Sequence, residues 1–121
     1  MSPELLLLSV ALGSLGALVR FGIQCWAAGA GSARLGILAV NVLGSGLAGV
    51  AFALPESFTT AAILAGFCGG LTTLSTMVVH LLPLPGAPPV RSRLGLGLAH
   101  VLGSVGAGLA TYSAVAWWLV N

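Results

Sequence analysis

Charged side chains are scarce in this sequence of 121 residues: only 5% are Asp, Glu, Lys or Arg. Soluble domains carry roughly 25% charged residues, which they need to cover their surface. The chain has no lysine, and its net charge of +2 provides too few cations to neutralise the phosphates of a nucleic acid. Hydrophobic residues make up 58% of the chain. The composition predicts a membrane protein and excludes a nucleic-acid binder.

Acidic residues and cysteines are equally few. The two carboxylates, Glu4 and Glu56, lie far apart in the sequence, which argues against hydrolysis by paired acids and bases. Cys25 and Cys68 lie in apolar sequence without C-x-x-C spacing, so neither a disulfide framework nor a zinc site is expected. No phosphate-binding loop or nucleophile–base pair occurs in the sequence. We therefore do not expect an enzyme.

Long apolar stretches fill most of the chain. A helix needs about 20 mainly apolar residues to cross a bilayer. Four stretches meet this requirement, and they cover residues 4–28, 35–54, 60–82 and 94–120. The predicted fold is an all-α membrane protein in which residues 1–121 form a single domain with four transmembrane helices. Such a protein belongs to the inner or plasma membrane as a multi-pass protein.

The arginines are distributed unevenly between the two sides of the predicted bundle. Arg34, Arg91 and Arg93 lie in two connectors that four spans place on the same side, and Arg20 lies nearer that end of the first span. Cytoplasmic loops carry an excess of Lys and Arg. We therefore expect cytoplasmic connectors, extracellular termini and a single orientation.

Glycine is abundant, with 18 residues, and it falls mainly inside the predicted spans. Small residues let membrane helices approach closely, and the pair Ser45 and Gly49 has the spacing for such packing. The stretch Gly66–Met77 combines three glycines with four hydroxyl residues, which favours a helix broken near Gly69–Thr73. A continuous helix whose hydroxyls bond back to its own carbonyls is the alternative. Four thin helices rarely enclose a pathway alone, so a dimer is expected.

Neutral polar side chains recur inside the other spans. Asn41 lies near the middle of the second span, where it either bonds another helix or meets a permeant species. His100, Ser104 and Gly108 repeat every four residues and therefore share one face of the fourth span. Amide and hydroxyl donors without fixed charge suit a small anion that must exchange water for hydrogen bonds.

Three motifs carry a family resemblance. Residues 16–21 (Gly-Ala-Leu-Val-Arg-Phe), 41–45 (Asn-Val-Leu-Gly-Ser) and 66–77 resemble the Fluc/CrcB fluoride channel family in order and spacing. The resemblance implies a small subunit that forms an antiparallel dimer with fluoride pores and a structural Na⁺ ion at the dimer centre. It also implies roles for individual residues. The carbonyls of Gly69 and Thr72 match the sodium site, and Arg20 matches a structural arginine of the first span. The residues that match the fluoride path are Asn41, Ser75, Thr76, His100 and Ser104.

One departure from the family pattern stands out. The family motif usually carries two phenylalanines whose ring edges face fluoride, and here Leu74 and Met77 occupy those positions. Two identical chains with one fixed orientation cannot form an antiparallel dimer. The leading hypothesis is therefore a passive fluoride exporter that works as a heterodimer with an oppositely oriented homologue.

Two other functions remain open. A non-conducting structural or regulatory subunit fits the loss of the two phenylalanines. A small multidrug-type proton-coupled transporter needs a membrane-buried carboxylate, which neither Glu4 nor Glu56 provides.

Overall fold

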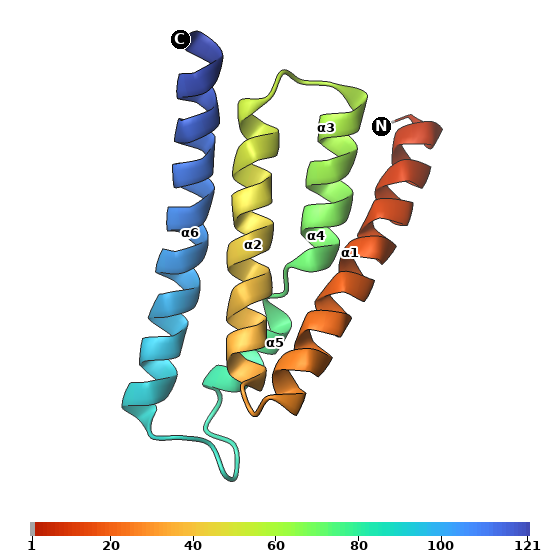
Figure 1. The fold of residues 1–121 in the computed structure, drawn as a ribbon. Helices are drawn as coiled ribbons and strands as arrows, with labels where there is room; N and C mark the ends of the chain where they lie inside the picture. Colours follow the sequence, from red (N-terminus) through yellow and green to blue (C-terminus); the bar gives the residue numbers. More distant parts are fainter. Residues whose placement is uncertain (1) are drawn as a thin grey trace.

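Four long helical segments run side by side in the computed structural model, which describes residues 2–121 (Figure 1). The first is α1 (Pro3–Gly29), the second is α2 (Ala33–Ala53) and the last is α6 (Val90–Val120). The third consists of shorter pieces that together span Phe58–Leu81. All four segments are long and apolar enough to cross a membrane, so the predicted four-helix membrane fold is confirmed.

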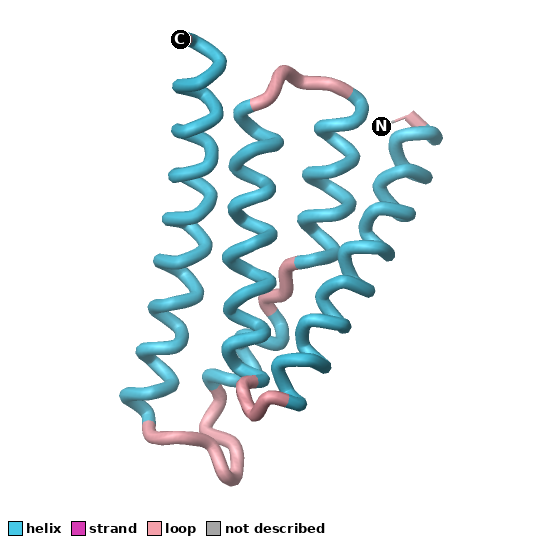
Figure 2. Tube along the Cα trace, viewed as in Figure 1, coloured by secondary structure: helices cyan, strands magenta, loops and turns pink. Residues whose placement is uncertain are grey.

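The third segment is broken, as predicted. It comprises α3 (Phe58–Ala62), a π-helical turn η1 (Ile63–Cys68), α4 (Gly69–Leu71) and α5 (Ser75–Leu81). Between α4 and α5 the chain leaves the helix at Thr72, whose ψ of 157° is extended. Figure 2 shows this interruption as a loop inside the bundle, between α4 and α5. Gly69 and Gly70 stay helical, and the non-helical residues are Thr72, Thr73 and Leu74.

The connectors are shorter than the sequence indicated. Arg34 is the second residue of α2, and Arg91 and Arg93 lie in the first turn of α6. The last helix starts at Val90, directly after Pro89, and a proline at this position is tolerated because the N–H that it lacks would have no partner inside the helix. Both arginine-bearing ends still lie at one end of the bundle, opposite the two termini (Figure 1).

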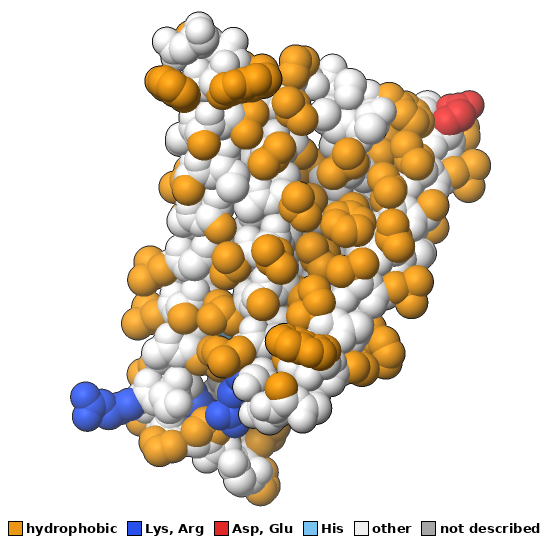
Figure 3. Space-filling model, in the orientation of Figure 1, with side chains coloured by type: hydrophobic (Ala, Val, Ile, Leu, Met, Phe, Trp, Pro, Cys, Tyr) orange, Lys and Arg blue, Asp and Glu red, His pale blue; other side chains and the backbone are white. Residues whose placement is uncertain are grey.

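The outer surface is apolar along the bundle. Figure 3 shows hydrophobic side chains over most of the visible face, with arginines at one end and an acidic side chain at the other. Trp26 is 77% exposed near the end of α1, and Trp117 and Trp118 are 69% and 72% exposed near the end of α6. Because α1 and α6 end at opposite ends of the bundle, these tryptophans suit the two membrane interfaces.

Small residues set the contacts between helices. A Cβ atom on Gly16 would meet the backbone of Phe67 and Leu71, and one on Gly70 would meet Gly13. These contacts join α1 to the third segment. A Cβ atom on Gly49 would likewise meet the Gly108 carbonyl and the Thr111 hydroxyl on α6. Close packing of α2 and α6 therefore requires glycine at position 49.

Gly49→Ala is expected to lower the free energy of unfolding by about 1–3 kcal/mol, because the methyl group must push α6 away. Gly106→Ala is the matched control, since nothing lies within 4 Å of its Cβ position. That control should be neutral or stabilise the helix by up to about 1 kcal/mol. Denaturation of both variants in detergent micelles measures the difference. Equal stability of the two variants would contradict the packing.

Candidate functional site

The helix break is held by Asn41, which projects from α2. The backbone N–H of Thr73 donates to Asn41 Oδ1 at 2.8 Å, and Asn41 Nδ2 donates to the Thr73 carbonyl at 2.9 Å. Asn41 and Thr73 are both buried, at 8% and 9% exposure. A non-helical peptide at membrane depth needs partners for its polar groups, and one carboxamide supplies both. The interhelical hydrogen bond considered for Asn41 is thus present.

Arg20 supports the break from α1. Its Nη1 donates to the Thr72 carbonyl at 3.0 Å, and the Thr72 hydroxyl donates back to the Cys68 carbonyl at 3.0 Å. In a continuous helix the Thr76 N–H would donate to the Thr72 carbonyl, but here it donates to Thr73 Oγ1 at 3.4 Å. The guanidinium of Arg20 supplies the hydrogen bond that the Thr72 carbonyl would otherwise lack. This contact fits the structural role that the resemblance implies for Arg20.

The break also releases the carbonyl of Gly69. In a continuous helix this carbonyl would accept from the Thr73 N–H, which here donates to Asn41. Gly69 is exposed, and nothing lies within 4 Å of its Cβ position. A freed carbonyl on an open face suits a cation, whereas the Thr72 carbonyl already carries a guanidinium and keeps one lone pair. The pair fits Na⁺ only as part of a larger set of oxygens.

His100 packs against the other side of Asn41. It is 2% exposed, and its Nδ1 lies 3.3 Å from Asn41 Nδ2. Its other ring nitrogen, Nε2, is buried and has no hydrogen-bond partner among residues 2–121. The structure therefore joins α2, the helix break and α6 through a single chain of contacts that runs from Thr73 through Asn41 to His100.

Two adjoining cavities follow the groove between α2 and α6. The first, of about 340 Å³, is lined by Asn41, His100 and Ser104 together with Leu74 and Met77. The second, of about 430 Å³, is lined by Ser104, Gly108 and Tyr112. Ser45 and Ser104 line both cavities. The row of residues predicted on one face of the fourth span therefore does face one groove.

The structure places Ser75 and Thr76 apart from this groove. Their hydroxyls lie 3.3 and 3.1 Å from Thr73 Oγ1. Ser75 is exposed, and Thr76 lines a different cavity of about 270 Å³ between α1, α2 and α5. Of the five residues expected along the fluoride path, the groove brings together Asn41, His100 and Ser104.

Leu74 ends the break and points away from the subunit core, with 70% of its side chain exposed. It replaces one of the expected phenylalanines, and it lines the first cavity together with Met77, which is partly buried. The groove therefore has an exposed apolar edge at Leu74 and Met77.

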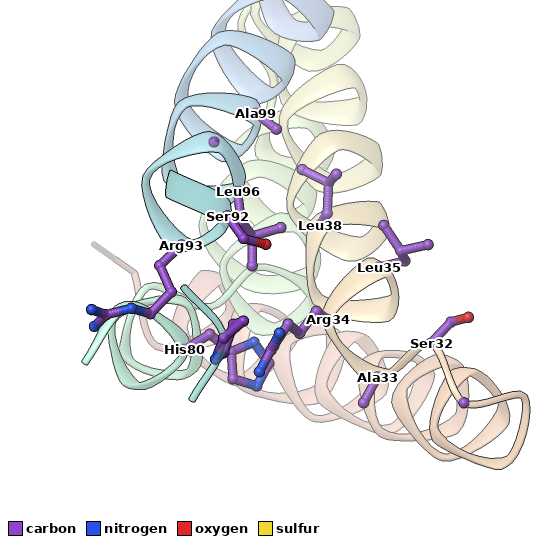
Figure 4. Close-up of a pocket in the computed structure, with 13 residues that line it drawn as sticks. Ser32, Ala33, Arg34, Leu35, Leu38, His80, Ser92, Arg93, Leu96 and Ala99 are labelled. Atoms are coloured by element: carbon purple, nitrogen blue, oxygen red, sulfur yellow. The ribbon is translucent and has the colours of Figure 1, made fainter. Parts of the chain in front are cut away.

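A third cavity, of about 620 Å³, lies at the arginine-bearing end of the bundle. Figure 4 shows Arg34 and His80 close together in it, while Arg93 extends to the side. Arg93 Nη1 donates to the Leu81 carbonyl at 2.9 Å and so caps the end of α5. Among residues 2–121, no carboxylate lines this cavity. This end of the bundle therefore carries positive charge that no carboxylate in the cavity balances.

Thr73 is the residue that sequence reasoning missed. Its backbone holds Asn41, and its hydroxyl accepts from the Thr76 N–H at the start of α5. Two adjacent threonines after two glycines were visible in the sequence, but only the fold shows which of them faces Asn41. The sequence alone therefore does not tell whether Thr72 or Thr73 bonds Asn41.

Comparison with known proteins identifies relatives along nearly the whole chain. The model of the family described as "CrcB-like protein, Camphor Resistance (CrcB)" matches residues 7–117. The protein named fluoride-specific ion channel FluC 1 of Thermobifida fusca is 37% identical over 116 residues, which cover 93% of this chain and 97% of that protein. The fluoride-specific ion channel FluC of Variovorax paradoxus is 40% identical over 109 residues, covering 82% of this chain and 85% of that protein.

A further relative, the fluoride-specific ion channel FluC of Gloeobacter violaceus, is 36% identical over 111 residues, covering 84% of this chain and 88% of that protein. No solved structure matches the chain. The family match and these relatives agree with the resemblance that the sequence motifs carry. The chain therefore belongs to the CrcB/Fluc family.

Proposed function

We propose that this chain is one subunit of a passive fluoride channel that exports fluoride and relieves its toxicity. The observation that carries the proposal is the helix break, which Asn41 holds beside a groove lined by His100 and Ser104. The names of the relatives, each a fluoride-specific ion channel, support the choice of ion.

The groove offers the chemistry that a small anion requires. Its polar lining consists of hydroxyl, amide and imidazole groups, and no charged side chain of the described residues 2–121 lines either cavity. Neutral donors can replace water around fluoride without holding it so tightly that it cannot leave. The cationic end of the bundle raises the local anion concentration at the mouth.

A structural Na⁺ ion is part of the proposal. The freed carbonyl of Gly69 and the carbonyl of Thr72 would hold it, together with the same carbonyls of a second subunit. The ion would supply electrostatic attraction between subunits at the helix breaks, as cations do at unwound membrane helices. One chain alone offers too few oxygens, so the ion requires the dimer.

The second subunit is an oppositely oriented homologue in this proposal. Arg34, Arg91 and Arg93 lie at one end of the bundle, which we assign to the cytoplasm, with the termini outside. Two copies with that bias cannot insert antiparallel. Leu74 and Met77 leave an apolar edge without aromatic rings, and the partner would bring its own rings to the groove.

Leu74 and Met77 also favour a second candidate, a non-conducting structural or regulatory subunit of such a channel. This subunit would keep the fold and the sodium carbonyls but would not complete a fluoride path. A proton-coupled transporter has less support, because Glu4 lies in the first turn of α1 and Glu56 in the connector after α2. Neither carboxylate lies at membrane depth.

The test of the channel class uses liposomes that hold this chain with an oppositely biased homologue. Fluoride efflux is measured with an ion-selective electrode after a potassium ionophore is added. The ionophore dissipates the membrane potential that would otherwise stop the efflux of an anion. We expect rapid efflux of fluoride, little efflux of chloride and no change when a pH gradient is imposed. Efflux that follows the proton gradient would instead support a coupled transporter.

A further inference from the structure

The cavity of about 620 Å³ at the arginine-bearing end lies between the starts of two helices. Arg34 lines it near the start of α2, and Ser92 and Arg93 line it near the start of α6. His80, near the end of α5, completes its polar wall. Trp26 is 77% exposed near the end of α1, at the same end of the bundle, and so suits the membrane interface there. The cavity therefore lies at the depth of lipid headgroups.

The positive charge of Arg34 is not balanced within the subunit. Arg20 and Arg93 donate to backbone carbonyls, whereas the exposed Arg34 guanidinium has no hydrogen-bond partner among residues 2–121. Figure 4 shows Arg34 beside the ring of His80, inside the cavity. Both carboxylate side chains lie at the opposite end of the bundle, one in the first turn of α1 and one after α2. An anion from outside the subunit can therefore pair with Arg34.

Deeper in the bundle, the wall of this cavity becomes apolar. Leu38 on α2 lines it there, as do Leu96 and Ala99 on α6. Leu38 lies one helical turn beyond Arg34, and Ala99 lies two turns beyond Ser92, about 6 and 10 Å along the helix axes. A small soluble anion has no apolar part to place against this wall, whereas a phospholipid has a charged headgroup followed by apolar carbons. The cavity has the amphipathic profile of a lipid.

The lining also favours one class of headgroup. Ser32 and Ser92 line the cavity, and each carries a hydroxyl that can bond the hydroxyls of a glycerol headgroup. Phosphatidylglycerol combines such hydroxyls with a phosphate for Arg34. Phosphatidylcholine carries the same phosphate together with a quaternary ammonium, for which this cavity has no carboxylate among residues 2–121.

We infer that this cavity binds the headgroup of an anionic phospholipid, with Arg34 on the phosphate. Basic pockets between membrane helices bind anionic headgroups through the same chemistry. The guanidinium can donate two parallel hydrogen bonds to a phosphate, which a lysine in its place could not. The bound lipid joins the start of α2 to the start of α6. It needs neither fluoride nor a second subunit, so the inference does not depend on the proposed function.

Titration of phosphatidylglycerol into the full chain in detergent, read by native mass spectrometry, measures how many lipids bind and how tightly. We expect one retained phosphatidylglycerol per chain. Arg34→Gln should weaken its binding roughly tenfold or more, as for one hydrogen bond between charged groups. Arg91→Gln is the matched control, because Arg91 lies in the first turn of α6 but does not line the cavity. The control should lose about threefold or less, since both arginines are exposed and only Arg34 faces the lipid.

Gly95→Leu tests the cavity without changing a charge. Gly95 lines the cavity and nothing lies within 4 Å of its Cβ position, so a leucine there occupies the space of the lipid. This variant should also weaken phosphatidylglycerol binding roughly tenfold or more. Gly106→Leu is its control, because Gly106 has the same free space but lies outside the cavity. Thermal unfolding checks that both variants are folded.

Equal losses in Arg34→Gln and Arg91→Gln, or wild-type affinity in a folded Gly95→Leu variant, would overturn the inference, because the lipid would then be held by general attraction to charge. Equal affinity for phosphatidylcholine, or no retained lipid at all, would also overturn it. Displacement of phosphatidylglycerol by inorganic phosphate, but not by sodium chloride at the same ionic strength, would show a site for free phosphate instead. Retention of the lipid in both salts supports the lipid headgroup.

Discussion

Asn41→Leu is expected to abolish fluoride efflux and to lower the free energy of unfolding so far that most of the protein is unfolded. The substitution leaves the N–H and the carbonyl of Thr73 without partners inside the bundle, because the leucine cannot bond either group. Two unsatisfied buried backbone groups cost about 2–6 kcal/mol together. No water in the bilayer core can replace the lost bonds. Denaturation in detergent micelles measures the loss of stability, and liposome efflux measures the loss of function.

Thr111→Val is the matched control for this effect. The Thr111 hydroxyl also joins α6 to α2, since it lies 2.7 Å from the Gly46 carbonyl. That carbonyl lies inside α2 and keeps its own helical hydrogen bond, so the loss should be about 1 kcal/mol or less. A protein with Asn41→Leu that is as stable as one with Thr111→Val would show that the break does not depend on Asn41.

Moving the positive charges to the other end of the bundle is expected to invert the chain in the membrane. Arg34, Arg91 and Arg93 begin α2 and α6 at one end, and Glu56 and Asn121 lie at the other. We would replace the three arginines with glutamine and introduce Glu56→Lys and Asn121→Lys. The excess of Lys and Arg in short loops sets the orientation. A C-terminal reporter should then change from mostly extracellular to mostly cytoplasmic.

The control replaces the same three arginines with lysine. Lysine carries the same charge and counts equally toward orientation. This variant should keep the wild-type orientation, whereas it removes the guanidinium of Arg93 that caps α5 at the Leu81 carbonyl. A reporter that stays on one side in both variants, or that lies on both sides in the wild type, would refute the assigned orientation.

The sequence predicted the number of helices and the interruption of the third because both depend on local composition. Runs of about 20 apolar residues are sufficient to predict spanning helices. Gly69 and Gly70 weaken the helix just before the threonines, so the region of the break could also be predicted. The individual residues of the break could not be predicted, because the non-helical conformation of Thr73 depends on hydrogen bonds from its N–H and carbonyl to Asn41 on another helix.

The candidate site divides in the same way. His100 and Ser104 could be placed on one face from their spacing alone, and the groove between α2 and α6 agrees. The separation of Thr76 from that groove was not predictable, since the chain turns at the break and α5 starts in a new direction. The Arg20 contact with the Thr72 carbonyl likewise joins residues 52 positions apart.

The most direct test of the central claim compares this chain alone with the chain co-purified with an oppositely biased homologue, both in liposomes loaded with fluoride. If the functional unit is an antiparallel heterodimer, the pair should discharge the fluoride gradient and the chain alone should not. Full efflux from the chain alone would contradict the heterodimer and show that Leu74 and Met77 line a working path. Efflux from neither preparation would contradict the channel itself and favour the non-conducting subunit.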